Sequence, residues 1–116
     1  MAELSAVELG EGPISIEVDG EFDLADEERA QELIDRALES SAALLIDLTT
    51  CSFMDSTGLR ILLRTHMRAQ TGGLRFAIAG SEPAVRRTLE ITGLDESLPL
   101  YDDRTAALGA LAVEPT

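Results

Sequence analysis

The sequence contains no lysine, no tryptophan and only one cysteine, Cys51. A single cysteine excludes a disulfide within the chain and favours a reducing compartment, and its place beside an apolar run predicts a buried structural thiol. Aromatic residues make up only 3% of the chain, so little is available for stacking on nucleic-acid bases. The core must therefore be built from leucine, isoleucine, valine and alanine.

Positive charge is also scarce. The nine basic residues are all arginines, against 22 acidic residues, and the formal net charge is −13. An acidic chain repels nucleic-acid phosphates and anionic lipid, so we expect no direct nucleic-acid partner and no membrane partner. The N-terminus lacks the basic and apolar regions of a signal peptide, and no apolar run approaches the roughly 20 residues that span a bilayer. These absences predict a cytoplasmic protein, and the length of 116 residues predicts a single domain over residues 1–116.

What the sequence does contain is an alternation of strand and helix patterns. Ile14, Ile16 and Val18 alternate with polar residues, as in a half-buried strand. We expect strands over residues 4–9, 14–18, 44–48, 74–79 and 97–101, and a loop over 20–23. We expect helices over residues 26–38, from 56 to the Gly72-Gly73 pair, from a cap at Ser81 to Gly93, and from a cap at Asp102 or Asp103 to about Leu111.

The order of these elements is β-β-α-β-α-β-α-β-α. We therefore predict an α/β fold with a mixed, mostly parallel sheet of about five strands and about four helices, in which the first two strands form an antiparallel hairpin. Helical spacing places apolar residues of the second and third helices in the core: Leu59, Leu62, Leu63, His66 and Met67, then Val85, Leu89 and Ile91.

The most informative stretch runs from Phe53 to Leu59 and reads FMDSTGL. It joins a buried strand to a helix, so Ser56 is expected on an exposed turn where that helix begins. Unpaired backbone N–H groups and the positive end of the helix dipole favour negative charge there. The hydroxyl can cap the helix or accept a phosphoryl group that the helix tolerates. Asp55 can share the cap, and Gly58 leaves room for a kinase beside the hydroxyl.

Three arginines, Arg60, Arg64 and Arg68, recur at every fourth residue of the same helix and therefore share one face. They form either a solvated face with weak salt bridges to nearby acids, or a stripe on which a partner docks. His66 is expected to be semi-buried and structural.

Three segments carry a family resemblance. They are GEFDL at residues 20–24, LIDL at 45–48 followed by the Phe53–Leu59 stretch, and LEITGL at 89–94. In order and spacing they resemble the STAS family (sulfate transporter and anti-sigma-factor antagonist domains), most of all the small free-standing bacterial anti-sigma-factor antagonists. The resemblance spans nearly the whole chain and implies a single STAS-like domain.

The resemblance implies a function by partner switching. An unphosphorylated antagonist binds an anti-sigma factor, which is itself a serine kinase of the histidine-kinase-like ATPase fold, and thereby frees a sigma factor. The kinase phosphorylates the serine after the signature aspartate, here Ser56, and the antagonist is released. A serine phosphatase resets the switch. Thr57 is the competing phosphate acceptor. We expect the partner to contact Asp23, Asp55, Ser56, Thr57, Gly58, Arg60 and Arg64.

Other functions fit the residues less well. A serine hydrolase needs a base within about 3 Å of the serine oxygen, whereas the single histidine, His66, lies ten residues along the same helix, roughly 15 Å away. A two-component receiver relies on a lysine, which the chain lacks. We expect no enzymatic activity, no catalytic residue, no metal and no cofactor. A non-enzymatic STAS scaffold subunit of a signalling or lipid-transport complex remains the alternative.

Overall fold

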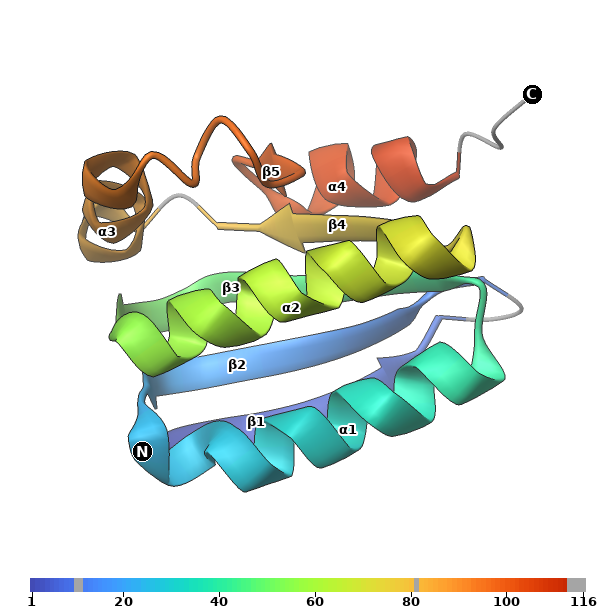
Figure 1. Ribbon diagram of the computed structural model, residues 1–116, viewed down its shortest axis with the longest axis horizontal. Coiled ribbons are helices and arrows are strands. Elements are labelled where there is room, and N and C mark those ends of the chain that lie inside the picture. The colour runs from blue at the N-terminus through green and yellow to red at the C-terminus, as the bar shows by residue number, and fades with distance from the viewer. Residues whose placement is uncertain (10–11, 81, 113–116) are drawn as a thin grey trace.

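The computed structural model describes residues 1–9, 12–80 and 82–112. In these residues one mixed sheet has the strand order β1-β2-β3-β4-β5, with β1 and β2 antiparallel and all other neighbours parallel (Figure 1). The strands are β1 (Ala2–Glu8), β2 (Ile14–Phe22), β3 (Ala43–Met54), β4 (Arg75–Ala79) and β5 (Leu100–Tyr101). The helices are α1 (Glu27–Ser40), α2 (Ser56–Gly72), α3 (Pro83–Thr92) and α4 (Arg104–Leu111). The predicted fold class and element order are confirmed.

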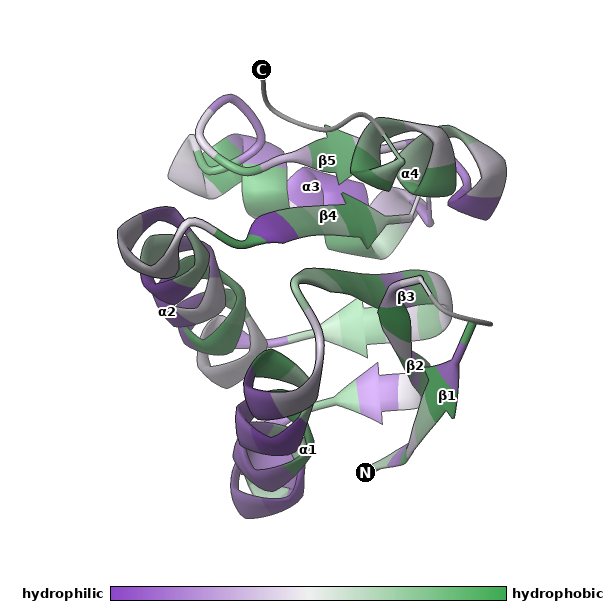
Figure 2. Ribbon diagram, turned by 90° about the vertical axis from the view of Figure 1, so that its right-hand side faces the viewer, coloured by the Kyte–Doolittle hydropathy of each residue, from purple (hydrophilic) through white to green (hydrophobic). Residues whose placement is uncertain are grey.

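Helices cover both faces of the sheet because side chains alternate along each strand. On one face, Leu44, Ile46 and Leu48 of β3 join the main core with residues of α1, α2 and α3. On the other face the contacts are mostly small: Ala43, Leu45, Ala77, Ala79, Ala107 and Leu111. Figure 2 shows α1 and α2 on one side of the sheet and α4 on the other. The alanines leave space for α4 to lie close to β3 and β4.

The central strands are longer than their apolar runs. β3 reaches Met54 instead of ending near Leu48, and β2 continues through Phe22, so the loop expected over residues 20–23 is wrong for all but Asp23. The two extensions pair with each other, Phe22 with Met54, across two register shifts. Gly20 accommodates this irregular stretch with a positive φ of 98°. Pairing with a distant segment therefore supplies hydrogen bonds that local polarity does not reveal.

The helix ends agree with most of the sequence signals. Gly73 and Gly93 adopt the left-handed conformation, with φ of 69° and 75°. Asp103 caps α4 by accepting a hydrogen bond from the N–H of Ala106 at 2.7 Å. The predicted cap at Ser81 lies outside the described residues. β5 has only two residues instead of the expected five, and α1 begins one residue later than expected.

The core assignment of α2 and α3 needs two corrections. Met67 is 58% exposed and Ile91 is 78% exposed, whereas Val85 and Leu89 are buried as expected. The buried face of α2 instead includes Ile61, Thr65 and Ala69. Thr65 enters the core because its hydroxyl donates a hydrogen bond to the carbonyl of Ile61 at 2.7 Å, which satisfies the polar group. Hydropathy alone does not show this.

Two further expectations hold. His66 is half-buried, with its ring 6.2 Å from that of Phe76. Cys51 is 1% exposed, and burial raises the pKa of its thiol, as expected for a structural cysteine. Among the described residues, no helix is both long enough and apolar enough to cross a membrane.

Candidate functional site

The predicted site residues gather where β2 and β3 end. Phe22 and Met54 pair as the last residues of these parallel strands, so Asp23 and Asp55 follow at the same edge of the sheet. The N–H of Asp55 donates a hydrogen bond to the carbonyl of Phe22 at 3.2 Å, which ties the two chain segments together. Ser56 comes next and begins α2. The fold thus brings Asp23, Asp55 and Ser56 to the same edge of the sheet.

Asp55, not Ser56, caps α2. One oxygen of its carboxylate, Oδ1, accepts hydrogen bonds from the N–H of Thr57 at 2.9 Å and of Gly58 at 3.3 Å. Capping was one of the two possibilities for the Ser56 hydroxyl, and it does not occur, because the extended backbone of Asp55 directs the Asp55 side chain at these two donors. Ser56 is the first helical residue and is exposed. Its hydroxyl has no hydrogen-bond partner among the described residues.

The next two residues are turned inward. Thr57 is only 5% exposed, so its hydroxyl is far less accessible than that of Ser56. A Cβ on Gly58 would lie 2.3 Å from Cγ of Met54 and 3.2 Å from Cδ2 of Phe22. Glycine is therefore needed for packing behind the helix, whereas the sequence suggested a need for space in front of it. Partner contacts by Thr57 and Gly58 stay predictions.

Asp23 has a structural task of its own. Its Oδ1 accepts a hydrogen bond from the N–H of Ala25 at 3.0 Å and caps a short 3-10 helix, η1 (Leu24–Asp26). Asp26 returns the bond by accepting from the N–H of Asp23 at 3.0 Å. This reciprocal capping fixes the chain next to Asp55. A contact of Asp23 with a partner stays a prediction.

Two exposed apolar side chains belong to the motif segments around this edge of the sheet, and the sequence analysis did not identify them as site residues. Leu24 is 67% exposed and Phe53 is 47% exposed. Phe53 also lines a hollow of about 390 Å³ together with Pro83, Ala84, Arg87 and Thr88 of α3. The sequence could have indicated these two residues, because both belong to the motif segments that lie where β2 and β3 end. Exposed large apolar groups beside a polar centre are typical of interaction surfaces.

The arginines of α2 reach across to α1, which lies alongside it (Figure 1). Arg60 pairs with Glu27 at 3.1 Å, Arg64 donates to Oε1 of Gln31 at 3.1 Å, and Arg68 pairs with Asp35 at 2.6 Å. Hydrogen bonds from Arg68 and then Gln31 lower the pKa of the Asp35 carboxyl. The exposed pairs each contribute about 0–1 kcal/mol to stability. The salt bridges expected of a solvated face therefore exist at Arg60 and Arg68.

A separate polar cluster lies on the opposite face, under α4. Asp47 is 6% exposed, and its carboxylate accepts hydrogen bonds from the Thr49 hydroxyl at 2.6 Å and from Arg104 at 2.6 Å. Arg104 also donates to the hydroxyl of Ser15 at 3.1 Å. Burial acts to raise the pKa of the Asp47 carboxyl, but the bonds from Thr49 and Arg104 outweigh it and lower the pKa. This cluster joins α4 to the sheet.

Known proteins resemble this chain over most of its length. It is 28% identical over 104 residues to an anti-sigma F factor antagonist of Paenibacillus polymyxa, covering 88% of this chain and 89% of that protein. It is 29% identical over 98 residues to the anti-sigma-F factor antagonist RsfB of Mycobacterium tuberculosis, covering 84% and 80% of the two chains.

A solved structure agrees with both the fold and the family. The crystal structure of an anti-sigma factor antagonist from Mycobacterium paratuberculosis superimposes with a TM-score of 0.88 at 30% identity, covering 97% of this chain and 96% of that one. The family model described as the STAS domain matches residues 6–107. Since this match includes most of the sheet, α1, α2, α3 and the Asp55–Ser56 edge, the chain belongs to the STAS domain family.

Proposed function

We propose that the protein is an anti-sigma-factor antagonist that acts by partner switching. The observation that carries the proposal is the exposed hydroxyl of Ser56 at the start of α2, beside a capping aspartate. Relatives that cover most of the chain bear the name of anti-sigma factor antagonists. In this proposal the unphosphorylated protein binds an anti-sigma factor in the cytoplasm and frees a sigma factor.

The switch is phosphorylation of Ser56 by the anti-sigma factor, a serine kinase of the histidine-kinase-like ATPase fold. The Ser56 oxygen forms a bond to the γ-phosphorus of ATP, the hydroxyl proton leaves, and ADP departs with the electrons of the broken phosphoanhydride bond. The protein is the substrate in this step and supplies no catalytic group. A serine phosphatase then hydrolyses the phosphoserine and restores the hydroxyl.

The geometry supports a switch that acts at the surface. Phosphate adds about −1.5 to −2 charge, and it does so beside the Asp55 carboxylate. The N–H groups of Thr57 and Gly58 are already bonded to Asp55, so they are not free to neutralise the phosphate. The new charge therefore faces the solvent. A partner that fits the neutral hydroxyl is then repelled by the phosphate, or binding must remove water from the phosphate at a cost in free energy. We propose that Asp23, Asp55, Ser56, Arg60 and Arg64 contact the partner directly, with Thr57 and Gly58 beneath them.

Phosphorylation is tested by measuring intact mass after incubation with ATP and the purified ATPase-fold anti-sigma factors of the same organism. The native chain should gain one phosphate, and Ser56→Ala should gain none. The control Ser52→Ala, which alters an exposed serine of β3, should still gain one phosphate. Peptide mapping that placed the phosphate on Thr57 would contradict the site. A stable complex without any phosphate transfer would favour the scaffold function instead.

Partner release is tested by calorimetry with the same purified anti-sigma factor. Ser56→Ala should bind like the native chain, because the interface accepts a small neutral group. Ser56→Asp should bind about tenfold more weakly, which corresponds to about 1.4 kcal/mol, since a second carboxylate must be desolvated next to Asp55. Equal affinities of the two variants would place Ser56 outside the interface.

A further inference from the structure

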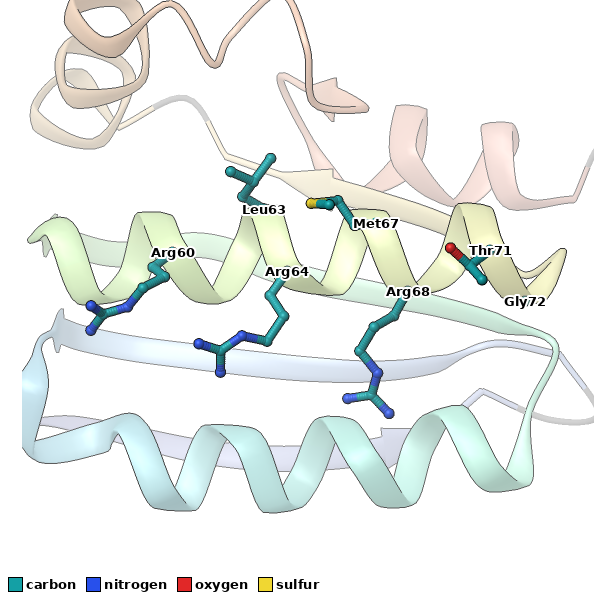
Figure 3. Close-up of a pocket in the computed structure, with 7 residues that line it drawn as sticks. All are labelled: Arg60, Leu63, Arg64, Met67, Arg68, Thr71 and Gly72. Carbon is teal, nitrogen blue, oxygen red and sulfur yellow. The ribbon is translucent and has the colours of Figure 1, made fainter.

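The outer surface of α2 carries a groove that the sequence analysis did not identify. It has a volume of about 630 Å³ and runs from Arg60 to Gly72. Figure 3 shows the three arginines extending toward α1, while Leu63 and Met67 extend from the other side of the helix. Met67 is 58% exposed. The groove therefore has an apolar side and a basic side.

The arginines that line this groove are not equivalent. Arg60 and Arg68 each meet a carboxylate, that of Glu27 and that of Asp35. Arg64, between them, meets only the neutral amide of Gln31 at 3.1 Å. No carboxylate of the described residues lies within 4.0 Å of Arg64 to pair with it. Among the described residues Arg64 thus has no carboxylate partner, and its positive charge lies in the middle of the basic side of the groove, in a chain of net charge −13.

We propose that this groove receives a helix of the anti-sigma factor, which packs apolar side chains on Leu63 and Met67 and places one carboxylate on Arg64. The inference rests on the proposed function and identifies the chemistry of the partner surface. The lining residues span residues 60–72 of α2, about 18 Å at 1.5 Å per residue, which matches about three turns of a helix. All residues that line the groove belong to α2, so the groove is open on the side away from this helix. An open groove of this kind can accept a second helix that lies alongside α2.

This surface is separate from the switch. Leu63 and Met67 lie seven and eleven residues after Ser56, roughly 10 and 16 Å along the helix axis. The groove therefore contributes the same binding contacts whether or not Ser56 carries phosphate, and phosphorylation weakens binding through the contacts at the N-terminus of α2. Loss of the groove contacts and phosphorylation should weaken binding independently.

The first test compares Arg64→Gln with Arg68→Gln. Both variants remove one positive charge from the same groove, so they are matched in net charge. Calorimetry at 50 mM NaCl, with the purified anti-sigma factor that binds the native chain, should show at least fivefold weaker binding for Arg64→Gln and less than twofold for Arg68→Gln. At 300 mM NaCl the difference should shrink because salt screens the contact. Equal effects of the two variants would overturn the proposal.

A second pair of variants tests the same surface without removing an arginine. Gln31→Glu supplies Arg64 with a carboxylate from α1, so partner binding should weaken about fivefold. Gln70→Glu makes the same charge change at an exposed position of α2 and should leave binding within twofold. Met67→Ala should weaken binding about threefold, and Ile91→Ala, also exposed but on α3, should not. Thermal unfolding of each variant checks that the fold is intact.

The outcomes separate this inference from the proposed function. If the native chain binds the anti-sigma factor and is phosphorylated on Ser56, but Gln31→Glu and Met67→Ala bind like the native chain, only the groove assignment is wrong. If the native chain binds no anti-sigma factor of the organism, the proposed function is wrong and the groove assignment falls with it. The Arg64→Gln variant phosphorylated on Ser56 tests independence. If its loss of affinity equals the product of the two separate losses, the groove and the switch act independently as proposed.

Discussion

Asp47 lies within β3, and Asp55 follows the end of the same strand, eight residues later, yet the two carboxylates have different structural roles. Asp47 is buried under α4, and its carboxylate is held by Thr49 and Arg104. Asp55 lies at the edge of the sheet, where its carboxylate holds backbone N–H groups of α2. The first charge is fixed inside the molecule, and the second stands next to an exposed hydroxyl. The role of each motif aspartate therefore follows from its hydrogen-bond partners. Of these two aspartates, Asp55 is the one whose charge adjoins a phosphate placed on Ser56.

The largest effect should follow from breaking the buried cluster. Asp47→Ala leaves Arg104 without its shortest charged contact and should reduce the free energy of unfolding by about 2–4 kcal/mol. The value stays at the lower end because the Arg104 side chain is 33% exposed. Thermal unfolding should show a melting temperature lower by roughly 10 °C or more.

The matched control for this prediction is Asp19→Ala, which removes an exposed aspartate from β2. Surface changes of this kind usually alter stability by less than about 0.5 kcal/mol. Similar losses for Asp19→Ala and Asp47→Ala would show that the buried cluster is not special.

The same cluster should make stability sensitive to acid. The pKa of Asp47 is lowered in the folded protein, so its contribution is complete above the unfolded pKa of about 3.9 and is lost as the pH falls through the folded pKa. Stability measured by urea unfolding should therefore fall below about pH 4 more steeply in the native chain than in Asp47→Asn. Parallel pH profiles for the two proteins would contradict the assignment of this acid sensitivity to Asp47.

A smaller effect is expected at the exposed aspartate. Asp55→Ala removes the cap of α2 and should cost about 1 kcal/mol, as should Asp103→Ala at the start of α4. Asp55→Asn should keep the stability within about 0.5 kcal/mol, since asparagine caps as well as aspartate. This variant thus isolates the charge of Asp55 from its structural role. A loss above about 3 kcal/mol for Asp55→Ala would remove the distinction between the two aspartates.

The smallest effect on folding should come from phosphorylation itself. Phosphate on Ser56 meets the favourable end of the helix dipole and the unfavourable charge of Asp55, and these terms oppose each other. The melting temperature of the phosphorylated protein should differ from that of the native chain by less than about 5 °C, the scale of about 1 kcal/mol. Loss of helical circular dichroism after phosphorylation would mean that the switch acts by unfolding α2.

The sequence predicted what depends on local signals. The Gly73 and Gly93 helix ends, the buried Val85 and Leu89, and the alternation of strands and helices were all visible as patterns. The length of β3 was not, because its second half is held by the distant residues 19–22 of β2. The cap of α2 was ambiguous for a different reason. Asp55 and Ser56 are both good capping residues, and only the backbone conformation decides which side chain reaches the free N–H groups.

The arginine stripe shows where pattern reading ends. The four-residue spacing predicted that Arg60, Arg64 and Arg68 share one face of the helix. It could not predict which side chains that face contacts. The answer depends on how α1 lies along α2, and this brings residues 33 positions apart into contact three times. The difference between Arg64 and its neighbours then follows from a single residue of α1, the neutral Gln31.

The antiparallel strand β1 is one edge of the sheet, and on its outer side the N–H and C=O groups of alternate residues have no neighbouring strand to bond. A second copy of the protein could pair its own edge strand with such an edge. Pairing of this kind would remove free protein and compete with the binding of a partner. Glu3 and Glu8 are both exposed on this strand. When two copies approach edge to edge, these carboxylates come together in an already acidic molecule. The acidic side chains on β1 therefore oppose association of two copies along this edge.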